Sequence, residues 1–274
     1  MTYQQAVKAN EAFLDRLSRQ ERLHRPTIAV WFSCGVVSAV AAKIALDSYS
    51  DKYDVRVLNT PISEEDDDNR RFLRDCEEWL GVRVETVIAS KYPTSSAVDV
   101  WDKRGAMSFP HGAPCTVHLK KEARQEWEAI HKPDWHVLGF SYDELKRHQK
   151  FVQTERENVL PVLIDRKLTR DDCGRLIISA GINPPGIYAE GYPNANCIGC
   201  VKATSPTYWN LVRRTRPKVF AERAEQSRRL GVRLVRVKGE RIFLDELDPL
   251  ATGSPLNTMK FDCGLFCEEW KDAT

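Results

Sequence analysis

The sequence of 274 residues contains no run of eighteen apolar residues, and its first 25 residues are polar and charged. A membrane-spanning helix needs about 20 apolar residues in succession, and a secretion signal has a short apolar core, so we expect neither. Low-complexity tracts, tandem repeats and heptad arrays are also missing. These absences predict a globular, cytoplasmic protein that does not use a membrane.

The chain also lacks an excess of charge of one sign, because 41 lysines and arginines stand against 39 acidic residues. Such a near balance gives no overall argument for nucleic-acid binding. The charge is locally uneven, with an acidic run at 64–68 and a basic stretch at 213–238. We interpret the basic stretch as a solvated helix face, with a phosphate-binding surface as the alternative.

Apolar runs rich in strand-forming residues alternate with segments of helical periodicity. The predicted strands are residues 27–32, 55–58, 82–88, 135–139 and 159–164, and the predicted helices are 39–46, 66–80, 117–130 and 169–180. Thr169, with Asp172 three residues later, is typical of a helix start. Strands separated by helices favour a parallel sheet covered on both faces. The expected fold class is α/β, with a Rossmann-like, mostly parallel sheet and helices on both faces.

Two stretches interrupt this alternation with prolines and glycines, residues 90–114 and 181–200, and both predict extended loops. A chain of this size buries roughly three quarters of its unfolded surface, which indicates one large domain with a small C-terminal subdomain and tail. We divide the chain into an N-terminal helix at 1–26, an adenine-nucleotide-binding α/β core with cluster loops at 27–200, and a helix, hairpin and cysteine-bearing tail at 201–274.

Eight cysteines are present, and three of them form a split pattern, Cys115 and then Cys197-Ile198-Gly199-Cys200. Two thiolates two residues apart can bind one metal centre, and a distant third can complete it from another element. In a reducing cytoplasm such spacing favours ligands over disulfides. The pattern predicts a metal site, with an iron-sulfur cluster ahead of zinc.

A short turn, Ser33-Cys34-Gly35-Val36-Val37-Ser38, follows the first apolar strand and precedes a helix. In that position backbone N–H groups and the hydroxyls of Ser33 and Ser38 can hold an anion against the positive end of the helix. We therefore expect Ser33, Gly35 and Ser38 to bind phosphate.

Four segments together resemble the phosphoadenosine phosphosulfate (PAPS) and adenosine phosphosulfate (APS) reductase family of adenine nucleotide alpha hydrolases, in its iron-sulfur form. They are the 33–38 turn and the stretches 114–120 (PCTVHLK), 196–200 (NCIGC) and 260–265 (KFDCGL). The first cysteine of the family's Cys-Cys-x-x-x-Lys segment is replaced here by Pro114.

The resemblance implies that Cys115, Cys197 and Cys200 ligate a [4Fe-4S] cluster. A fourth ligand must come from elsewhere, and we expect Cys267 as this ligand and Cys263 as a reactive thiol. Cys263 as the ligand, or a fourth iron left open, are the alternatives.

The same resemblance assigns a nucleotide site. Asn59 and Thr60, at the end of the second predicted strand, would contact the adenosine. Arg147 is the first candidate for a phosphate or sulfate clamp, because a guanidinium recognises such oxyanions bidentately, and Lys120 is the second. The expected ligand is APS, PAPS or ATP.

The implied activity is that of a sulfonucleotide reductase-like enzyme, an oxidoreductase acting on a sulfur group. The Cys263 thiolate would attack the sulfur of APS or PAPS, and an external thiol such as thioredoxin would release sulfite. Lys260, the bound phosphates and the cluster would favour the thiolate. The family's arginine directly after a glycine is missing at Gly139-Phe140-Ser141, which leaves the choice of substrate open.

Two other functions stay open. One is a sulfurtransferase that activates RNA or DNA with ATP and inserts sulfur from an open iron, with the 213–238 stretch holding the nucleic acid. Val37 stands where ATP pyrophosphatases carry an acid that helps hold magnesium, which weakens this reading. The other is a non-catalytic nucleotide- or cluster-sensing module, for which Val37 and Pro114 are the supporting departures.

Overall fold

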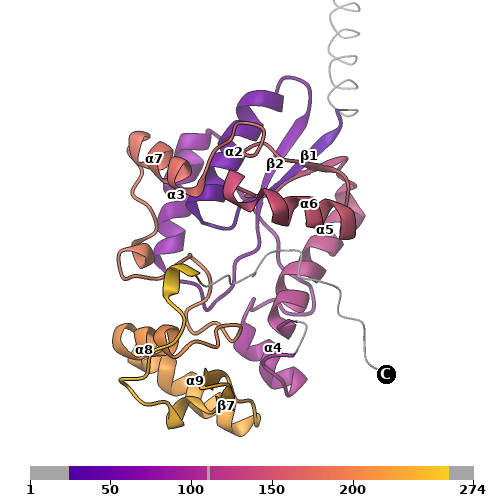
Figure 1. Cartoon of the computed structure of the whole chain (residues 1–274). Helices are drawn as coiled ribbons and strands as arrows, with labels where there is room; N and C mark the ends of the chain where they lie inside the picture. Colours follow the sequence, from indigo (N-terminus) through magenta and orange to yellow (C-terminus); the bar gives the residue numbers. More distant parts are fainter. Residues whose placement is uncertain (1–24, 110–111, 259–274) are drawn as a thin grey trace, which may run out of the picture.

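A computed structural model describes residues 25–109 and 112–258 (Figure 1). The helix expected at 1–26 falls almost entirely outside these residues, and so do the predicted tail residues Lys260, Cys263 and Cys267. Within the part described, no helix has the length and apolar character needed to cross a bilayer.

The core is a five-stranded sheet in which every pairing is parallel, as the alternation of strands and helices predicts. Its order is β3-β2-β1-β4-β5. The strands are β1 (Thr27–Trp31), β2 (Asp54–Asn59), β3 (Glu85–Thr86), β4 (Trp135–Val137) and β5 (Val159–Leu160). The α/β fold class is confirmed.

Eight α-helices surround and extend this sheet within the described residues. They are α2 (Val36–Tyr49), α3 (Asp68–Leu80), α4 (Ala97–Arg104), α5 (Glu122–His131), α6 (Leu145–Thr154), α7 (Arg170–Ser179), α8 (Pro206–Thr215) and α9 (Pro217–Arg229). A π-helical turn (Thr116–Lys121) runs directly into α5, and a small antiparallel hairpin joins β6 (Val235–Val237) to β7 (Glu240–Ile242).

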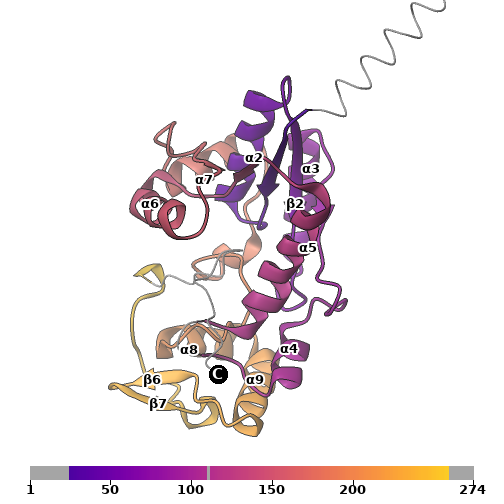
Figure 2. The same cartoon turned by 90° about the vertical axis from the view of Figure 1, so that its right-hand side faces the viewer.

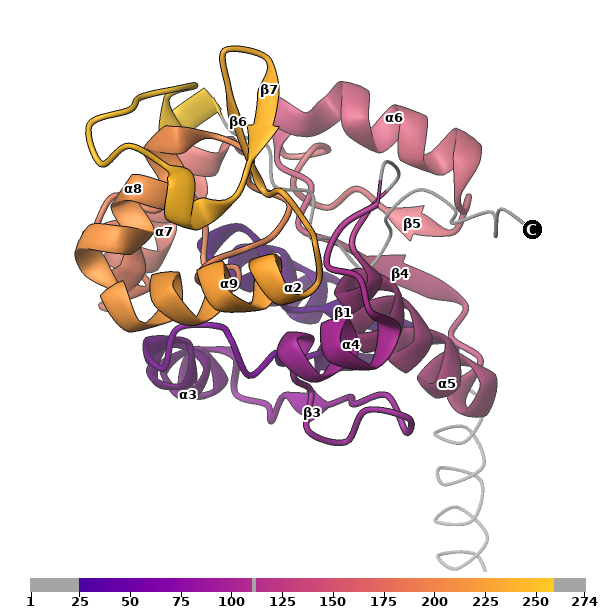
Figure 3. The same ribbon diagram turned by 90° about the horizontal axis from the view of Figure 1, so that it is seen from below.

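Alternating side chains of β1 sort the helices into two layers. Ile28 and Val30 are fully buried against α2, α3 and α7, whereas Ala29 and Trp31 face α5. Figure 3 shows α2, α3 and α7 on one side of the strands and α5 on the other. Both faces of the sheet are therefore covered.

A second apolar core lies beyond the carboxyl ends of the strands. It combines α4, α8 and α9 with the cysteine-bearing loops, and Trp101 and Trp209 are its largest buried side chains. Figure 2 shows these three helices together at one end of the molecule. The fold thus places the cysteine motifs next to the edge of the sheet where ligands bind in open α/β folds.

Several details differ from the sequence prediction: β5 has two residues where a strand at 159–164 was predicted, and α6 lies where no helix was predicted. The loop expected at 90–114 contains α4, whose start is capped by the Ser96 hydroxyl accepting a hydrogen bond from the Asp99 amide at 3.3 Å. The strand expected at 82–88 is only the two residues of β3. The basic helix expected after Pro206 is two helices, because Pro217 cannot continue α8 and begins α9.

Candidate functional site

The turn between β1 and α2 closes on its own hydroxyl groups. The Ser33 amide donates to Ser38 Oγ at 3.1 Å, and Ser38 Oγ donates to the Gly35 carbonyl at 2.9 Å. Cys34 adopts a left-handed backbone with φ of 55°. The loop is therefore preformed at the N-terminus of a 14-residue helix, as the prediction of a phosphate loop requires.

Asn59, predicted to contact the adenosine, instead fastens this loop. Its Nδ2 donates to the Phe32 carbonyl at 2.7 Å and lies 3.6 Å from Cys34 Sγ. Thr60 follows it and is also buried. The side chain of Asn59 therefore supports the loop in this structure, and contact with a nucleotide stays a prediction for both residues.

Gly139, directly after β4, lets the chain pass close to the start of α2. A Cβ atom added there would lie 3.1 Å from the Ser38 nitrogen and 3.2 Å from the Ser38 Cα. Only glycine leaves this space. The close approach to Ser38 therefore explains the glycine at position 139.

Tyr188 covers the same helix start and is absent from the sequence prediction. Its hydroxyl would lie 3.4 Å from a Cβ atom added to Gly35, and burial raises its pKa. A surface pocket of about 580 Å³ opens here, with Val36, Arg170, Arg175, Tyr188 and Tyr192 among its lining. Arginines at a helix N-terminus suit an anionic ligand.

A buried ion pair lies close to the loop. Lys120 Nζ is 3.6 Å from Glu65 Oε1, and these side chains are only 5% and 10% exposed. Burial raises the pKa of Glu65, and the charge of Lys120 opposes that rise. Burial, followed by the charge of Glu65, raises the pKa of the Cys34 thiol far above its usual range. Cys34 is therefore a neutral thiol rather than a reactive one.

Glu64, the preceding residue, connects the cysteine turn to α4. Its carbonyl accepts from the Ile198 amide at 2.9 Å. Its carboxylate accepts from Ser96 Oγ at 2.7 Å and from the Ala97 amide at 2.8 Å. Consecutive residues therefore contact the Lys120 turn and the Cys197–Cys200 turn, and the charge of Glu65 also acts on Cys34 in the 33–38 loop.

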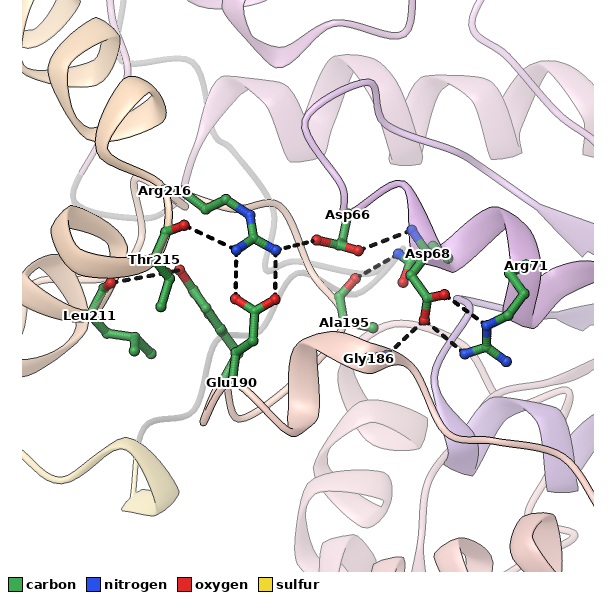
Figure 4. A network of polar contacts seen from close by, with 11 residues as sticks. Asp66, Asp68, Arg71, Gly186, Glu190, Ala195, Leu211, Thr215 and Arg216 are labelled. Atoms are coloured by element: carbon green, nitrogen blue, oxygen red, sulfur yellow. Dashed lines mark hydrogen bonds and ion pairs between the residues drawn. The ribbon is translucent and has the colours of Figure 1, made fainter.

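The rest of the acidic run also makes specific contacts (Figure 4). Asp66 pairs with Arg216 at 3.0 Å, and Arg216 pairs with Glu190 at 2.6 Å. Asp68 accepts from the Gly186 amide at 2.7 Å and pairs with Arg71, which lowers the pKa of Asp68 to about 2. The run fastens the loop that leads to the cysteine turn.

Cys115, Cys197 and Cys200, the predicted cluster ligands, lie in one buried apolar core. Each is at most 8% exposed. The Cys200 amide donates to the Tyr208 hydroxyl at 2.9 Å, and this hydroxyl donates to the Cys197 carbonyl at 3.4 Å. The fold thus brings cysteines from two distant segments into the same core.

Their chemistry suits a cluster, since three thiols share an environment shielded from water, with a buried guanidinium, that of Arg223, nearby. Across 25–109 and 112–258, no group of three or more histidine, cysteine or acidic side chains is arranged to hold a metal ion. Both tail cysteines predicted to complete the centre lie outside that range, so the ligand set stays a prediction.

Cys76 and Cys173, outside the split pattern, are small buried hydrophobes. Both are fully buried in the core around the sheet, and burial raises the pKa of each thiol to about 12. They provide internal controls for the three cysteines of the motif.

Arg147, the predicted oxyanion clamp, contacts residues of its own segment. It pairs with Glu144, and its guanidinium carbon lies 5.4 Å from the centre of the Phe140 ring. Lys120, the second candidate, is the buried partner of Glu65 described above. Arg170 and Arg175 line the pocket at the start of α2, where Arg170 donates to the Pro193 carbonyl and Arg175 pairs with Asp172 at 2.5 Å.

Most arginines of the basic stretch 213–238 make intramolecular contacts. Arg228 pairs with Asp245 at 2.7 Å, Arg229 pairs with Asp102 at 2.7 Å, and Arg213 donates to the Leu247 carbonyl at 2.8 Å. These contacts favour a structural role for much of the stretch over a continuous phosphate-binding surface.

Comparison with known families and with curated proteins finds no family model and no curated sequence that matches this chain.

Proposed function

We propose that this protein is a sulfonucleotide reductase-like oxidoreductase that acts on the sulfur of an adenylyl sulfate. The observation that carries the proposal is the connection through Glu64 and Glu65. These two residues fasten the cysteine turn through the Ile198 amide and position the buried Lys120 beside the phosphate loop. On this proposal the start of α2 and the buried thiol core serve one site.

The start of α2 would receive the phosphate of the nucleotide. The backbone amides of its first turn offer donors, and the Ser33 and Ser38 hydroxyls, which bond to each other and to the Gly35 carbonyl, hold the loop in shape. Arg170 lies at the rim of the adjacent pocket. Tyr188, whose hydroxyl lies beside Gly35 and which lines this pocket with Val36, would yield its position to the ligand.

Cys115, Cys197 and Cys200, with a tail cysteine, would hold the [4Fe-4S] cluster. When bound, the cluster would organise charge around the sulfate rather than deliver electrons. Lys120, five residues after Cys115, would direct its ammonium at the sulfate only by sharing it with Glu65, its buried partner. These residues would favour binding of a sulfate next to the nucleotide.

The tail residue Cys263 would act as the nucleophile. Its thiolate attacks the sulfur, a sulfur–sulfur bond forms, and the bond between the sulfur and the phosphate oxygen breaks to release the nucleoside phosphate. A dithiol such as thioredoxin then attacks the Cys263 sulfur. Sulfite leaves, and the two electrons come from oxidation of the dithiol to a disulfide.

The test begins with anaerobic purification, iron and sulfide analysis and a visible spectrum, followed by incubation with APS or PAPS and reduced thioredoxin. We expect iron with sulfide, and sulfite release from one of the two nucleotides. Cys197→Ala should lose most of its iron, whereas Cys173→Ala should keep it. Cys263→Ser should keep the nucleotide bound but release no sulfite.

Two results would overturn the proposal. A colourless protein containing zinc would replace the cluster with a different centre. An iron-loaded protein that releases no sulfite from either nucleotide would exclude the reductase activity. Because arginines of the 213–238 stretch are engaged internally, we expect only weak binding of RNA or DNA in the same preparation.

A further inference from the structure

Arg223 on α9 is a buried cation inside an apolar core. The residue is only 2% exposed, and its guanidinium carbon lies 4.6 Å from the centre of the Trp101 ring. Its Nη1 donates to Gln226 at 2.7 Å. Its Nε is buried and has no hydrogen-bond partner among the described residues.

A buried guanidinium needs a compensating negative charge, because removal from water is costly for an unpaired ion. No carboxylate of the described residues lies within ion-pair distance of Arg223. The charge of Glu64 acts on it, but the carboxylate of Glu64 accepts hydrogen bonds at the start of α4. The amide of Gln226 is neutral and compensates only in part.

The free edge of this guanidinium faces the cysteine turn. A Cβ atom added to Gly199 would lie 3.5 Å from Arg223 Nε, and Cys197 is among the groups whose charge acts on Arg223. Gly199 has a φ of 71° and lies between Cys197 and Cys200. The unpartnered N–H group is therefore next to the pair of predicted ligands.

We propose that Arg223 is the charge-compensating residue of the metal centre held by Cys115, Cys197 and Cys200. Three thiolates bring more negative charge than one metal ion or cluster balances, and the buried guanidinium offsets the excess. The inference rests on the proposed function for the existence of this centre. The new part is that Arg223 on α9 raises the reduction potential of the centre and slows the loss of its metal.

Arg228 provides a matched comparison on the same helix. It also stacks on an aromatic ring, 3.8 Å from the centre of Phe243, but it is exposed and pairs with Asp245 and Glu246. Replacement of either arginine by methionine removes a cation and a ring contact. Only Arg223 lies beside the cysteines.

The test compares wild type, Arg223→Met, Arg223→Lys and Arg228→Met as full-length proteins purified without oxygen. We expect Arg223→Met to release iron to a chelator about tenfold faster than wild type. Its cluster should also have a more negative reduction potential, since a nearby positive charge favours the reduced state. Arg223→Lys should recover part of both effects, and Arg228→Met should match wild type.

Thermal unfolding of the metal-free proteins identifies a variant that fails to fold. Binding of Cd²⁺ to the same metal-free proteins gives a readout that does not depend on iron. If wild type holds no iron but Arg223→Met binds Cd²⁺ more weakly than Arg228→Met, the proposed cluster fails and the role of Arg223 stands. Equal potentials, iron loss and Cd²⁺ binding in these two variants would overturn that role, as would a wild type that binds neither metal.

Discussion

The 33–38 loop and the cysteine turn differ in whether the polar groups around them have hydrogen-bond partners. In the loop, Ser33 and Ser38 bond to each other and to the Gly35 carbonyl, and Asn59 bonds to the Phe32 carbonyl. Beside the turn, a buried nitrogen of Arg223 has no partner among the described residues. The loop is thus complete before a ligand arrives, whereas the cysteine side has a charge that only a further negative group would balance.

The ion pair of Glu65 and Lys120 lies between the loop side, residues 33–38, and the cysteine side, residues 197–200. Breaking this pair should have the largest effect on the free energy of unfolding. Glu65→Gln leaves the Lys120 ammonium buried without this carboxylate, which costs about 3–5 kcal/mol in the free energy of unfolding. Urea unfolding at pH 7 measures the change.

The matched variant is the double substitution Glu65→Gln with Lys120→Met. Because it removes both charges, it should recover most of the stability lost in Glu65→Gln. A double variant as unstable as the single one would mean that the ion pair does not join the two sides.

Gly139→Ala tests the loop side alone. The added methyl group would press on the Ser38 backbone at 3.1 Å, and such overpacking costs about 1–3 kcal/mol. Nucleotide binding, measured by calorimetry, should weaken while iron content stays unchanged. Gly174→Ala is the control, because a Cβ atom there meets nothing within 4 Å and alanine favours the helix by about 1 kcal/mol.

Gly199→Ala tests the cysteine side in the same way. The backbone φ of 71° disfavours alanine, and its Cβ would lie 3.1 Å from Val219 Cγ1, so we expect a loss of about 1–2 kcal/mol. Iron content should fall while nucleotide binding is retained. Lower iron content in Gly139→Ala together with weaker nucleotide binding in Gly199→Ala would refute the division into a loop side and a cysteine side.

Asp68→Asn should have the smallest effect, and one that depends on pH. The pKa of Asp68 is lowered from 3.8 to about 2, first by Arg71, so the ionised side chain stabilises the fold above pH 4 and loses this contribution as the pH falls towards 2. Solvent screening reduces the gain to about 1 kcal/mol. Urea unfolding at pH 7 and pH 2.5 measures it, with Asp51→Asn on an exposed turn as the control.

The fold was largely predictable from the sequence because its signals are local. The buried run 27–32, the small-residue helix after the 33–38 turn and the Thr169 cap each depend on neighbouring residues. The missed helix α4 shows the limit of such reasoning. Ser96 caps it locally, but its Ala97 and Val98 amides donate to Glu64, which is 33 residues away from Ala97.

The candidate site was predictable only in part, for the same reason. The cysteines and the 33–38 loop have a recognisable spacing, and the structure places them in two apolar cores that both contact Tyr188. The roles of Glu65, Tyr188 and Arg223 depend on tertiary neighbours. In the sequence they are ordinary members of an acidic run, a proline-rich loop and a basic helix, so no local pattern separates them from their neighbours.

The contacts of Glu64 also determine how this region opens. The amides of Ile198 and Ala97 are distant in sequence but bond to the carbonyl and the carboxylate of this single residue. Their deuterium uptake should therefore rise in one concerted event whenever the 62–65 segment detaches. The cysteine turn and the first turn of α4 would then form one cooperative unit, whose opening frequency sets how often solvent oxidants reach the thiols.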